Sequence, residues 1–521
     1  MAGEKTRRTA ALGRSSLVFS VMTLLSRILG LLRDMLVARY FDSSITDPFF
    51  AALRIPNTLR RFFAEGGFAN AFVPVFSATR AESPQKVRDL LAHTTGTLMT
   101  VLLAVTVIGV IFAGSIVFAV AYGLVEKPAQ YLLATDMLRI MFPYIFLISL
   151  TALAGGVLNT YGRFAVPALT PVLLNVTLIL ACLWRAQAGE ASTLAYGMEL
   201  AWAVLLGGIL QLAIQIPFLA RLGLLVWPRW GWRHGGVRRI MRLMLPTLFG
   251  SSVGQLSVLV NTFLASLLAT GSISWLYYSD RMVELPVALI GVALGTVILP
   301  RLSALKASDD WQRFYVTLDW ALRWGLLVGS AAATGLVVLA PSILATLFYG
   351  GVFDAQDWLM TTQALRAYGI GAFFLIMVKV LAPAFYARHD TKTPVKAGIS
   401  AMLANMVAAL VLGHFFAHVG LALASTVAAI VNMMLLLLFL QRDGVRIKLF
   451  SLLYLAQLLM ANGAMACVLL WLQGDTALWL GYSSLQQMLQ LALIIMTGVI
   501  TFAAALYAMG INFRQLRLRM K

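Results

Sequence analysis

Charged residues are scarce in this chain. Aspartate, glutamate, lysine and arginine make up 12% of its 521 residues, whereas 60% of the residues are hydrophobic. An average soluble domain is about half apolar and about a quarter charged, so the chain lacks the polar surface that a water-soluble protein of this length requires. The composition excludes a soluble enzyme, a disulfide-linked secreted scaffold and a disordered protein. It predicts an all-α polytopic membrane protein.

Residues for metal binding and covalent chemistry are also few. The two cysteines, Cys182 and Cys467, lie in apolar runs, so neither a disulfide framework nor a thiolate metal site is expected. Of five histidines, His414 and His418 are four residues apart but lack a nearby carboxylate, and no metal-ligand cluster is predicted. The sequence has no phosphate-binding loop, dinucleotide fingerprint or nucleophile elbow. We therefore expect no enzyme activity and no cofactor, with coupling to a monovalent cation left open.

Apolar runs bounded by charged or turn residues predict about fourteen transmembrane helices, since one span needs about 20 mostly apolar residues. The first run follows a basic N-terminus. It carries Arg27, Arg33 and Asp34 and has no small-residue cleavage site, so we expect a retained span rather than a signal peptide. The predicted spans are 16–41, 47–79, 90–122, 131–161, 165–186, 194–220, 237–269, 272–304, 317–348, 358–387, 394–416, 418–440, 449–473 and 484–510.

The basic residues predict the orientation of these spans. When loops are assigned alternately to the two sides, 27 of the 40 basic residues fall on the side of the N-terminus. Only Lys127 and Arg185 fall on the other side, and 11 basic residues lie within spans. Cytoplasmic loops collect lysine and arginine, so both termini are predicted to be cytoplasmic. The net charge of +19 then reflects mostly membrane topology, and no nucleic-acid partner is expected.

Short matches at one spacing predict an internal duplication. Arg54 and Arg281 are 227 residues apart, and Pro74 and Pro300 are 226 apart. The segment Thr160-Tyr-Gly-Arg163 matches Phe385-Tyr-Ala-Arg388 at a spacing of 225. Six spans are an even number, so the two six-helix repeats are predicted to run parallel. Transporters built from such repeats bind substrate between the halves.

The predicted organisation follows from the spans and the duplication. It consists of a basic cytoplasmic N-terminus over 1–15, an N-terminal lobe over 16–222, a C-terminal lobe over 235–442, two further helices over 448–510 and a basic cytoplasmic tail over 511–521.

Charged residues inside the spans are the strongest functional signal. A charge at the membrane centre costs about 2.5–3.5 kcal/mol on insertion scales, so these residues must face an interior that solvates them. One interpretation is structural ion pairing, as in Arg61–Glu65 or Arg281–Glu284. The other is a water-filled cationic cavity. Its seven basic residues are Arg27, Arg33, Arg54, Arg60, Arg61, Arg281 and Lys379, against four acidic ones, Asp34, Glu65, Asp280 and Glu284. An excess of about three positive charges suits a phosphate or diphosphate held by arginine forks.

Four long motifs resemble the MurJ (MviN) lipid II flippases, over about residues 15–510. The motifs are Ser26-Arg-Ile-Leu-Gly-Leu-Leu-Arg-Asp34, Pro56-Asn-Thr-Leu-Arg-Arg-Phe-Phe-Ala-Glu-Gly66, Tyr277-Tyr-Ser-Asp-Arg281 and the stretch from Lys379 to Pro394. The resemblance implies the multidrug/oligosaccharidyl-lipid/polysaccharide exporter superfamily. It also implies fourteen helices, two six-helix lobes around a V-shaped cavity, and two added helices that form a hydrophobic groove.

The resemblance also implies a substrate and a site. The substrate would be lipid II, an undecaprenyl diphosphate carrying the peptidoglycan disaccharide-pentapeptide, moved by alternating access across the bacterial inner membrane. The resemblance also implies membrane lipids and cell-wall synthesis proteins as partners. Positions that match the essential cavity arginines of the family are Arg27, Arg33, Arg60 and Arg281, and further matched cavity positions are Asp47, Asn57, Glu65, Asp280, Glu284 and Lys379. Some relatives bind sodium in the second lobe, a site that cannot be carried over residue by residue.

Three alternatives remain at this point. The first is a flippase for another undecaprenyl-diphosphate-linked glycan or a drug/cation antiporter of the same superfamily, although a cation exporter should have an acidic cavity. The second is a membrane enzyme acting on lipid diphosphates, which would need a carboxylate-rich metal site or a nucleophile–base pair. The third is a membrane scaffold of cell-wall assembly, in which the charges are structural.

Overall fold

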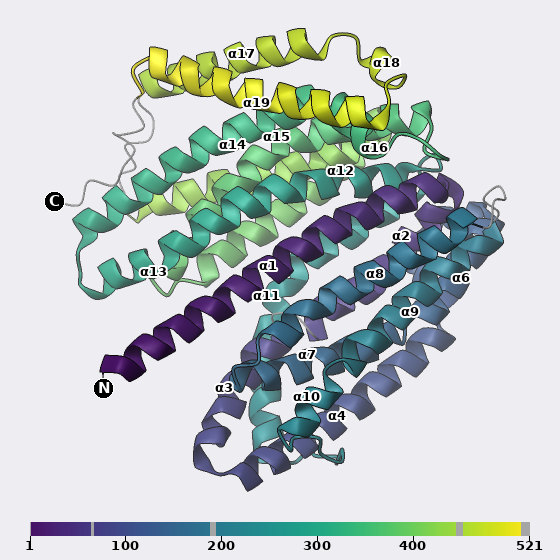
Figure 1. The fold of residues 1–521 in the computed structure, drawn as a ribbon, viewed down its shortest axis with the longest axis vertical. Coiled ribbons are helices and arrows are strands. Elements are labelled where there is room, and N and C mark those ends of the chain that lie inside the picture. The colour runs from purple at the N-terminus through teal and green to yellow at the C-terminus, as the bar shows by residue number, and fades with distance from the viewer. Residues whose placement is uncertain (1, 64–66, 188–193, 444–451, 512–521) are drawn as a thin grey trace. The chain divides into compact units, whose positions relative to one another are not determined.

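The computed structural model describes residues 2–63, 67–187, 194–443 and 452–511. Within these ranges the chain is helical apart from loops and one isolated β-bridge between Gly350 and Phe353. Helices are expected in a membrane, because no water is present there to satisfy open backbone groups. The helices form two compact units, Met1–Gly271 and Ser272–Lys521 (Figure 1).

The described residues of the first unit form eleven α-helices and two 3₁₀ segments. Helix α1 packs along α8, α8 packs along α9, and α3 contacts both α7 and α11. The elements are α1 Ala2–Tyr40, α2 Ser43–Phe63, α3 Gly67–Glu82, α4 Pro84–Ile111, α5 Ala113–Val120, η1 Tyr122–Glu126, α6 Pro128–Met141, α7 Tyr144–Thr160, α8 Ala165–Gln187, η2 Leu194–Gly197, α9 Met198–Ala213, α10 Ile216–Arg221 and α11 Gly235–Ser266.

In the second unit, the part of the chain that the structure describes forms eight α-helices and one π-helical segment. Helix α15 packs against α12, α14 and α16, while α17 and α19 pack on each other and on α14. The elements are α12 Ser272–Pro286, η3 Val287–Val292, α13 Ala293–Ala307, α14 Trp311–Leu347, α15 Ala355–Tyr386, α16 Lys392–Arg442, α17 Leu452–Gln473, α18 Thr476–Trp479 and α19 Ser484–Ala508.

The helices confirm the prediction of an all-α polytopic membrane protein. Ten helical stretches in the described part of the chain are long and apolar enough to span a membrane. They cover eleven of the fourteen predicted spans, because Lys392–Arg442 holds two of them. The other three predicted spans, 16–41, 47–79 and 237–269, lie on α1, on α2 with α3, and on α11.

The long helix α16 is interrupted at the position where the sequence separates two spans. Ala417 has φ 47° and ψ −130°, which is outside the helical region, between the predicted spans 394–416 and 418–440. A side chain at Gly420 would overlap the carbonyl oxygen of Leu412. Glycine therefore permits the close backbone approach on which this break depends.

One type of helix end recurs at the spacing that predicts the duplication. After α7, Gly162 has φ 74° and the amide of Arg163 donates to Leu158 O over 2.9 Å. After α15, His389 has φ 61° and the amide of Asp390 donates to Phe385 O over 3.0 Å. These two closures are 227 residues apart, as are Arg54 and Arg281.

Asp390 also holds the start of the next helix. Its Oδ1 accepts hydrogen bonds from the amides of Lys392 and Thr393, both at 3.0 Å. Burial alone would raise the pKa of the Asp390 carboxyl, but the hydrogen bonds from Thr393 and Lys392 and the charge of Arg388 lower it below its ordinary value. The carboxylate is thus ionised where it caps the turn into α16.

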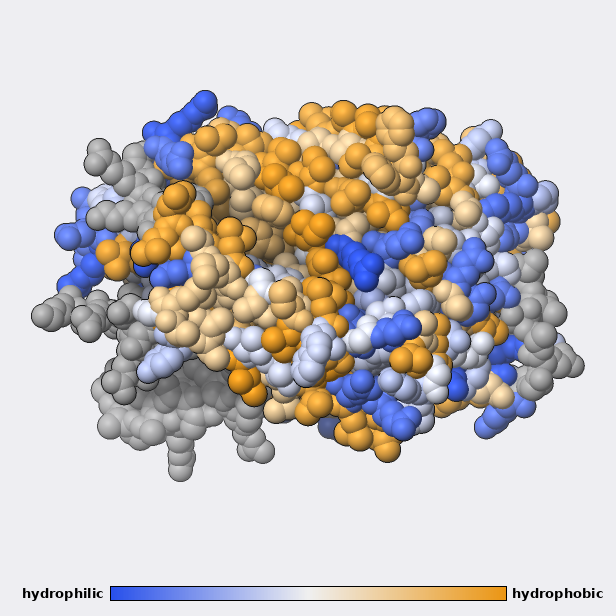
Figure 2. All heavy atoms as spheres, turned by 90° about the horizontal axis from the view of Figure 1, so that it is seen from above, coloured by the Kyte–Doolittle hydropathy of each residue, from blue (hydrophilic) through white to orange (hydrophobic). Residues whose placement is uncertain are grey.

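Large apolar side chains lie on the surface of the helices. Figure 2 shows broad apolar areas on the face it presents. On α17, Trp471 is 80% exposed and Leu459 is 73% exposed. Soluble proteins rarely expose contiguous apolar patches of this kind, and these surfaces suit contact with lipid.

In the first unit, the segment before α11 lies closely against α4. The amide of Arg229 donates to Ala92 O over 3.0 Å, and the amide of Gly231 donates to Thr97 Oγ1 over 3.0 Å. A Cβ at Gly96 would overlap the backbone of Arg229. The segment is therefore docked through backbone contacts that only a glycine in α4 allows.

We expect Gly96→Ala to destabilise the first unit. Alanine gains up to about 1 kcal/mol of helix propensity over glycine, but overpacking typically costs about 1–3 kcal/mol, and here the atom in the way is backbone. The apparent melting temperature of the purified protein in detergent should fall. Gly463→Ala is the matched control, since a Cβ on that glycine of α17 meets no atom within 4 Å. Equal melting temperatures for the two variants would contradict this account of the docking.

Candidate functional site

Arg33 on α1 is held in a network that reaches α8. Its Nε and Nη2 donate to Asp34 Oδ1 over 3.0 and 2.6 Å, and its Nη1 donates to Asn175 Oδ1 over 3.1 Å. The Nδ2 of Asn175 in turn donates to Ser26 O over 3.0 Å. The Arg33 side chain is 13% exposed and that of Asp34 only 1%. This predicted site residue therefore also joins two helices.

Arg27 lies two turns before Arg33 and has different surroundings. Its side chain is half-buried. No hydrogen bond or ion pair connects it to another residue in the described part of the chain. The guanidinium thus has no protein partner among the described residues, and its role in binding a ligand stays a prediction.

Helix α2 carries the next predicted residues. Asp47, one turn into the helix, is buried, and its Oδ2 accepts from the amide of Gly271 over 2.6 Å. Gly271 has φ 100°, so Asp47 stabilises a turn that requires glycine. Asn57 and Arg60 are half-buried and Arg61 is exposed on the second half of α2. The predicted partner of Arg61, Glu65, lies outside the described residues.

Helix α12 of the second unit carries a charge pair that the sequence predicts. Arg281 Nη1 lies 2.9 Å from Glu284 Oε2, with side-chain exposures of 31% and 55%. Asp280 is exposed beside them. Exposed pairs of this kind contribute little stability. The Arg281–Glu284 pair therefore costs little free energy to exchange for another anion.

Lys379 on α15 lies where α12 gives way to a π-helical segment. A Cβ at Gly291 would lie 3.0 Å from the Lys379 Cβ, and one at Gly295 would lie 3.0 Å from the Lys379 backbone oxygen. The two glycines therefore let the helices pack closely, as small residues often do between membrane helices. The Lys379 side chain is exposed, and π-helical turns are common at functional sites.

Comparison with known proteins identifies the family. The family model described as "Lipid II flippase MurJ" matches residues 36–500. A Vibrio cholerae protein named "Probable lipid II flippase MurJ" is 42% identical over 514 residues, 97% of each chain. The chain belongs to the MurJ family. A Burkholderia cenocepacia relative named "Lipid II flippase MurJ" is 43% identical over 83% of this chain and 84% of its own.

Solved structures agree with membership of the MurJ family. A "Lipid II flippase MurJ, inward closed conformation" matches with a TM-score of 0.79 and 26% identity, over 95% of this chain and 100% of that one. An inward-facing MATE transporter of the MOP superfamily matches with a TM-score of 0.65 and 13% identity, over 82% and 98% of the two chains. The second likeness shows a shared fold. It agrees with the predicted superfamily.

The membrane charges of this MurJ-family chain divide unevenly between the units. By sequence position, the second unit has Arg281 and Lys379 against Asp280 and Glu284, which balance. The first unit has the five other basic residues against Asp34 and Glu65, an excess of three positive charges, which the buried Asp47, also a predicted cavity residue, reduces to two. By sequence position, the positive excess predicted for the cavity therefore falls in the first unit.

Two groups of residues escaped the sequence analysis. Asn175 was apparent only as an amide in an apolar span, a type of residue that often joins membrane helices, and its partner Arg33 is 142 positions away. Asp89, His93 and His234 come together at the end of α4. The spacing of Asp89 and His93 by four residues could have suggested them, but nothing local indicates His234.

We expect Asn175→Ala to loosen the contact between α1 and α8. The substitution removes the bond from Arg33 and the bond to Ser26 O. Polar bonds between membrane helices contribute about 0.6 kcal/mol on average, so the loss should be about 1 kcal/mol and visible as a lower apparent melting temperature. Arg27→Ala is the control on the same helix and should melt like the wild type. A lower melting temperature for Arg27→Ala than for Asn175→Ala would show that the hydrogen-bond network does not hold α1 on α8.

Proposed function

We propose that this protein is a flippase that moves lipid II from the cytoplasmic to the periplasmic leaflet of the bacterial inner membrane, for peptidoglycan synthesis. The observation that carries the proposal is the match to relatives named as lipid II flippases along nearly the whole chain. Flipping makes and breaks no covalent bond. The protein would act as a transporter rather than an enzyme, without a resident cofactor.

The diphosphate of lipid II would bind in a cationic cavity through the arginines of α1 and α2. Arginine offers a planar fork that bonds two phosphate oxygens. Arg27 supports this role, because its guanidinium is half-buried without a partner in the described part of the chain. Arg33 would contribute from a fixed position set by Asp34 and Asn175. Charge-assisted hydrogen bonds of this kind contribute about 1.5–3 kcal/mol each.

Arg281 would join the site by exchanging its partner. In the structure it is bound to Glu284. A diphosphate carries more charge than a carboxylate and can replace Glu284. Such a difference in affinity between two states is what a ligand needs to shift a conformational equilibrium. Alternating access driven by substrate is therefore part of the proposal.

The undecaprenyl tail would lie along α17 and α19. Exposed apolar side chains on these helices include Leu459, Trp471 and Leu493, at 73%, 80% and 62%. Polar bonds hold α17 on α14, with Thr334 donating to Asn462 over 3.0 Å and Gln473 donating to Ser342 over 2.6 Å. The two helices thus offer a firmly attached apolar surface for a lipid chain.

Four contacts between loops or helix ends support the proposed topology. On the side predicted to be cytoplasmic, Asp89 lies 3.1 Å from His234 and Arg388 lies 2.9 Å from Asp443. On the side predicted to be periplasmic, Asp47 accepts from Gly271 over 2.6 Å and Lys127 donates to Leu268 O over 3.5 Å. Each contact joins two segments assigned to the same side.

We expect Arg27→Ala to abolish lipid II flipping. The assay uses cells in which this chain is the sole flippase and measures growth and the share of lipid II exposed at the periplasmic face. Loss of charge-assisted bonds should reduce transport about tenfold or more. Arg27→Lys should be impaired less, because it keeps the charge without the fork.

Two controls make this test specific. Arg39→Ala removes an exposed arginine in the last turn of the same helix and should transport normally. Membrane levels of each variant show whether insertion is intact. Full transport by Arg27→Ala would reject the diphosphate site. Cells depleted of the wild-type protein should accumulate lipid II on the cytoplasmic face, and normal flipping in them would reject the function itself.

Single-cysteine labelling tests the topology. In a background in which Cys182 and Cys467 are replaced by serine, Asp475→Cys and Arg233→Cys each supply one thiol. A membrane-impermeant maleimide added to spheroplasts should modify position 475 and spare position 233, because the excess of basic residues retains the second loop inside. Both positions should react in opened membranes. Labelling of position 233 but not of position 475 on intact spheroplasts would show that the predicted orientation is reversed.

A further inference from the structure

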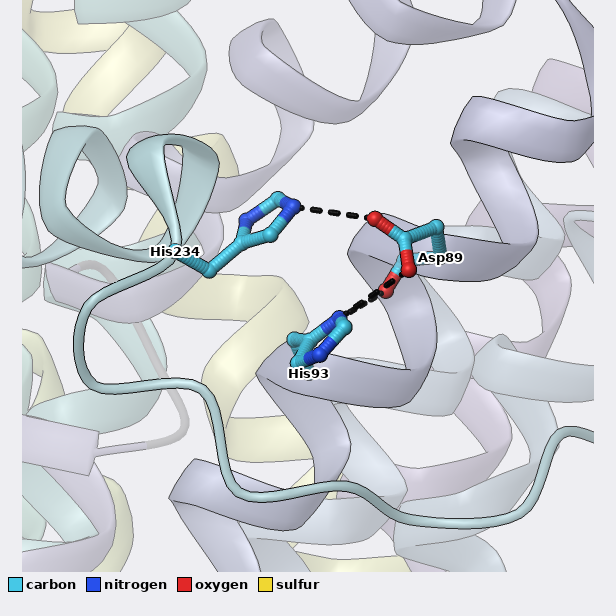
Figure 3. A group of neighbouring side chains, drawn as sticks. All are labelled: Asp89, His93 and His234. Carbon is cyan, nitrogen blue, oxygen red and sulfur yellow. Dashed lines mark hydrogen bonds and ion pairs between the residues drawn. The ribbon is translucent and has the colours of Figure 1, made fainter.

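Three side chains that the proposed transport does not use converge at one end of the first unit. Asp89 and His93 lie one turn apart on α4, and His234 immediately precedes α11 (Figure 3). Asp89 Oδ2 lies 3.1 Å from His234 Nε2, and Asp89 Oδ1 lies 3.3 Å from His93 Nδ1. One ligand atom from each residue lies within 4.8 Å of the others. We propose that these residues form a binding site for a divalent transition-metal ion of the zinc type.

The donor set suits such an ion. Zn²⁺ takes imidazole nitrogens and carboxylate oxygens at about 2.0–2.2 Å in a tetrahedral arrangement, which places neighbouring ligand atoms about 3.4 Å apart. The two distances from the Asp89 carboxylate to the histidine rings, 3.1 and 3.3 Å, are already close to that spacing. The two distances run to different carboxylate oxygens, Oδ2 and Oδ1, so the Asp89 carboxylate and the two rings all have to adjust to enclose one ion. Water would supply the fourth ligand, as it does in open zinc sites.

The site is assembled by backbone contacts that do not depend on a metal. The bonds from Arg229 to Ala92 and from Gly231 to Thr97 bring the segment before α11 onto α4. A Cβ at Gly231 would overlap His93, so the glycine allows this segment to lie directly against α4. The rings of His93 and His234 stack with centroids 4.8 Å apart and planes at 10°, so at least one ring must turn before both can direct a nitrogen at the same ion. The backbone is already in place for binding, which limits the loss of conformational entropy to the side chains.

The histidine rings have hydrogen-bonding capacity that the protein leaves incompletely used. His234 Nδ1 is buried and has no hydrogen-bond partner among the described residues. Because the nitrogen that faces Asp89 is Nε2, Nδ1 would not be the metal ligand of this ring. His93 Nδ1 lies 2.9 Å from the backbone oxygen of Asp89. Coordination would exchange this bond, and the one between His234 and Asp89, for bonds to the metal.

A bound ion would restrain the connection between α10 and α11. His234 ends the segment that follows α10, and Asp89 and His93 belong to the first three turns of α4. Both loops are predicted to be cytoplasmic, so the metal would come from that side. The ion would act as a clamp that fixes the start of α11 on α4. It is independent of lipid II binding, because none of its ligands belongs to the proposed diphosphate site.

Zinc binding to the full-length protein tests the site directly. The protein is purified in detergent with a tag free of histidine, washed with chelator and titrated with Zn²⁺ by calorimetry. We expect one Zn²⁺ per chain for the wild type and at least tenfold weaker binding for His93→Ala and for His234→Ala. Asp89→Asn should also bind more weakly, because the amide is a poorer ligand. His414→Ala, which removes an exposed histidine of α16, should bind like the wild type.

A measurement on the unaltered protein guards against misfolded variants. Diethyl pyrocarbonate modifies accessible imidazoles, and mass spectrometry reports each histidine separately. Zn²⁺ should protect His93 and His234 at least tenfold and leave His414 reactive. Zinc that binds equally well to the double variant His93→Ala/His234→Ala, or that protects no histidine in the wild type, would overturn the proposal. Lipid II transport measured in the same variants is expected to continue, which separates failure of this site from failure of the proposed function.

Discussion

The cost of an unpaired charge in hydrocarbon determines where this chain places its polar atoms. An ion at the membrane centre has no water to solvate it, so each charge in a span needs a partner or access to water. Arg33 meets this need with Asp34 and Asn175, and Arg281 meets it with Glu284. Arg27 has no such partner in the described part of the chain. Because the same energetic cost applies to Arg27, its charge needs water or a bound ligand in place of a protein partner.

The second constraint is how closely two segments of the chain can approach each other, and glycine permits the closest approach because it has no side chain. Gly96 lies against Arg229, and Gly291 lies against Lys379. Each contact positions a side chain by backbone packing, His234 in the first unit and Lys379 in the second. Polar groups that act in a membrane need such rigid supports, because a misplaced donor cannot turn to water for compensation.

The sequence predicted the helices and the break at Ala417 because hydropathy, charge and turn residues are local properties. It also predicted the Arg281–Glu284 pair, whose members are three residues apart on one helix. It did not predict that Asp47 binds the Gly271 amide, since 224 residues separate them. The meeting of His234 with α4 escaped for the same reason. Contacts between residues far apart in the sequence depend on tertiary packing, and the sequence around either residue does not indicate them.

The uneven division of charge has a mechanical consequence under the proposed function. By sequence position, the positive surplus predicted for the cavity belongs to the first unit, and the charges predicted for the cavity in the second unit balance. An anionic headgroup would then bind mainly to residues of the first unit. Arg281 of the second unit would respond to it, because its pair with Glu284 is half exposed and inexpensive to exchange. A ligand shifts an equilibrium only by its difference in affinity for the two states. In this arrangement that difference comes from one arginine and its choice between a carboxylate and a diphosphate.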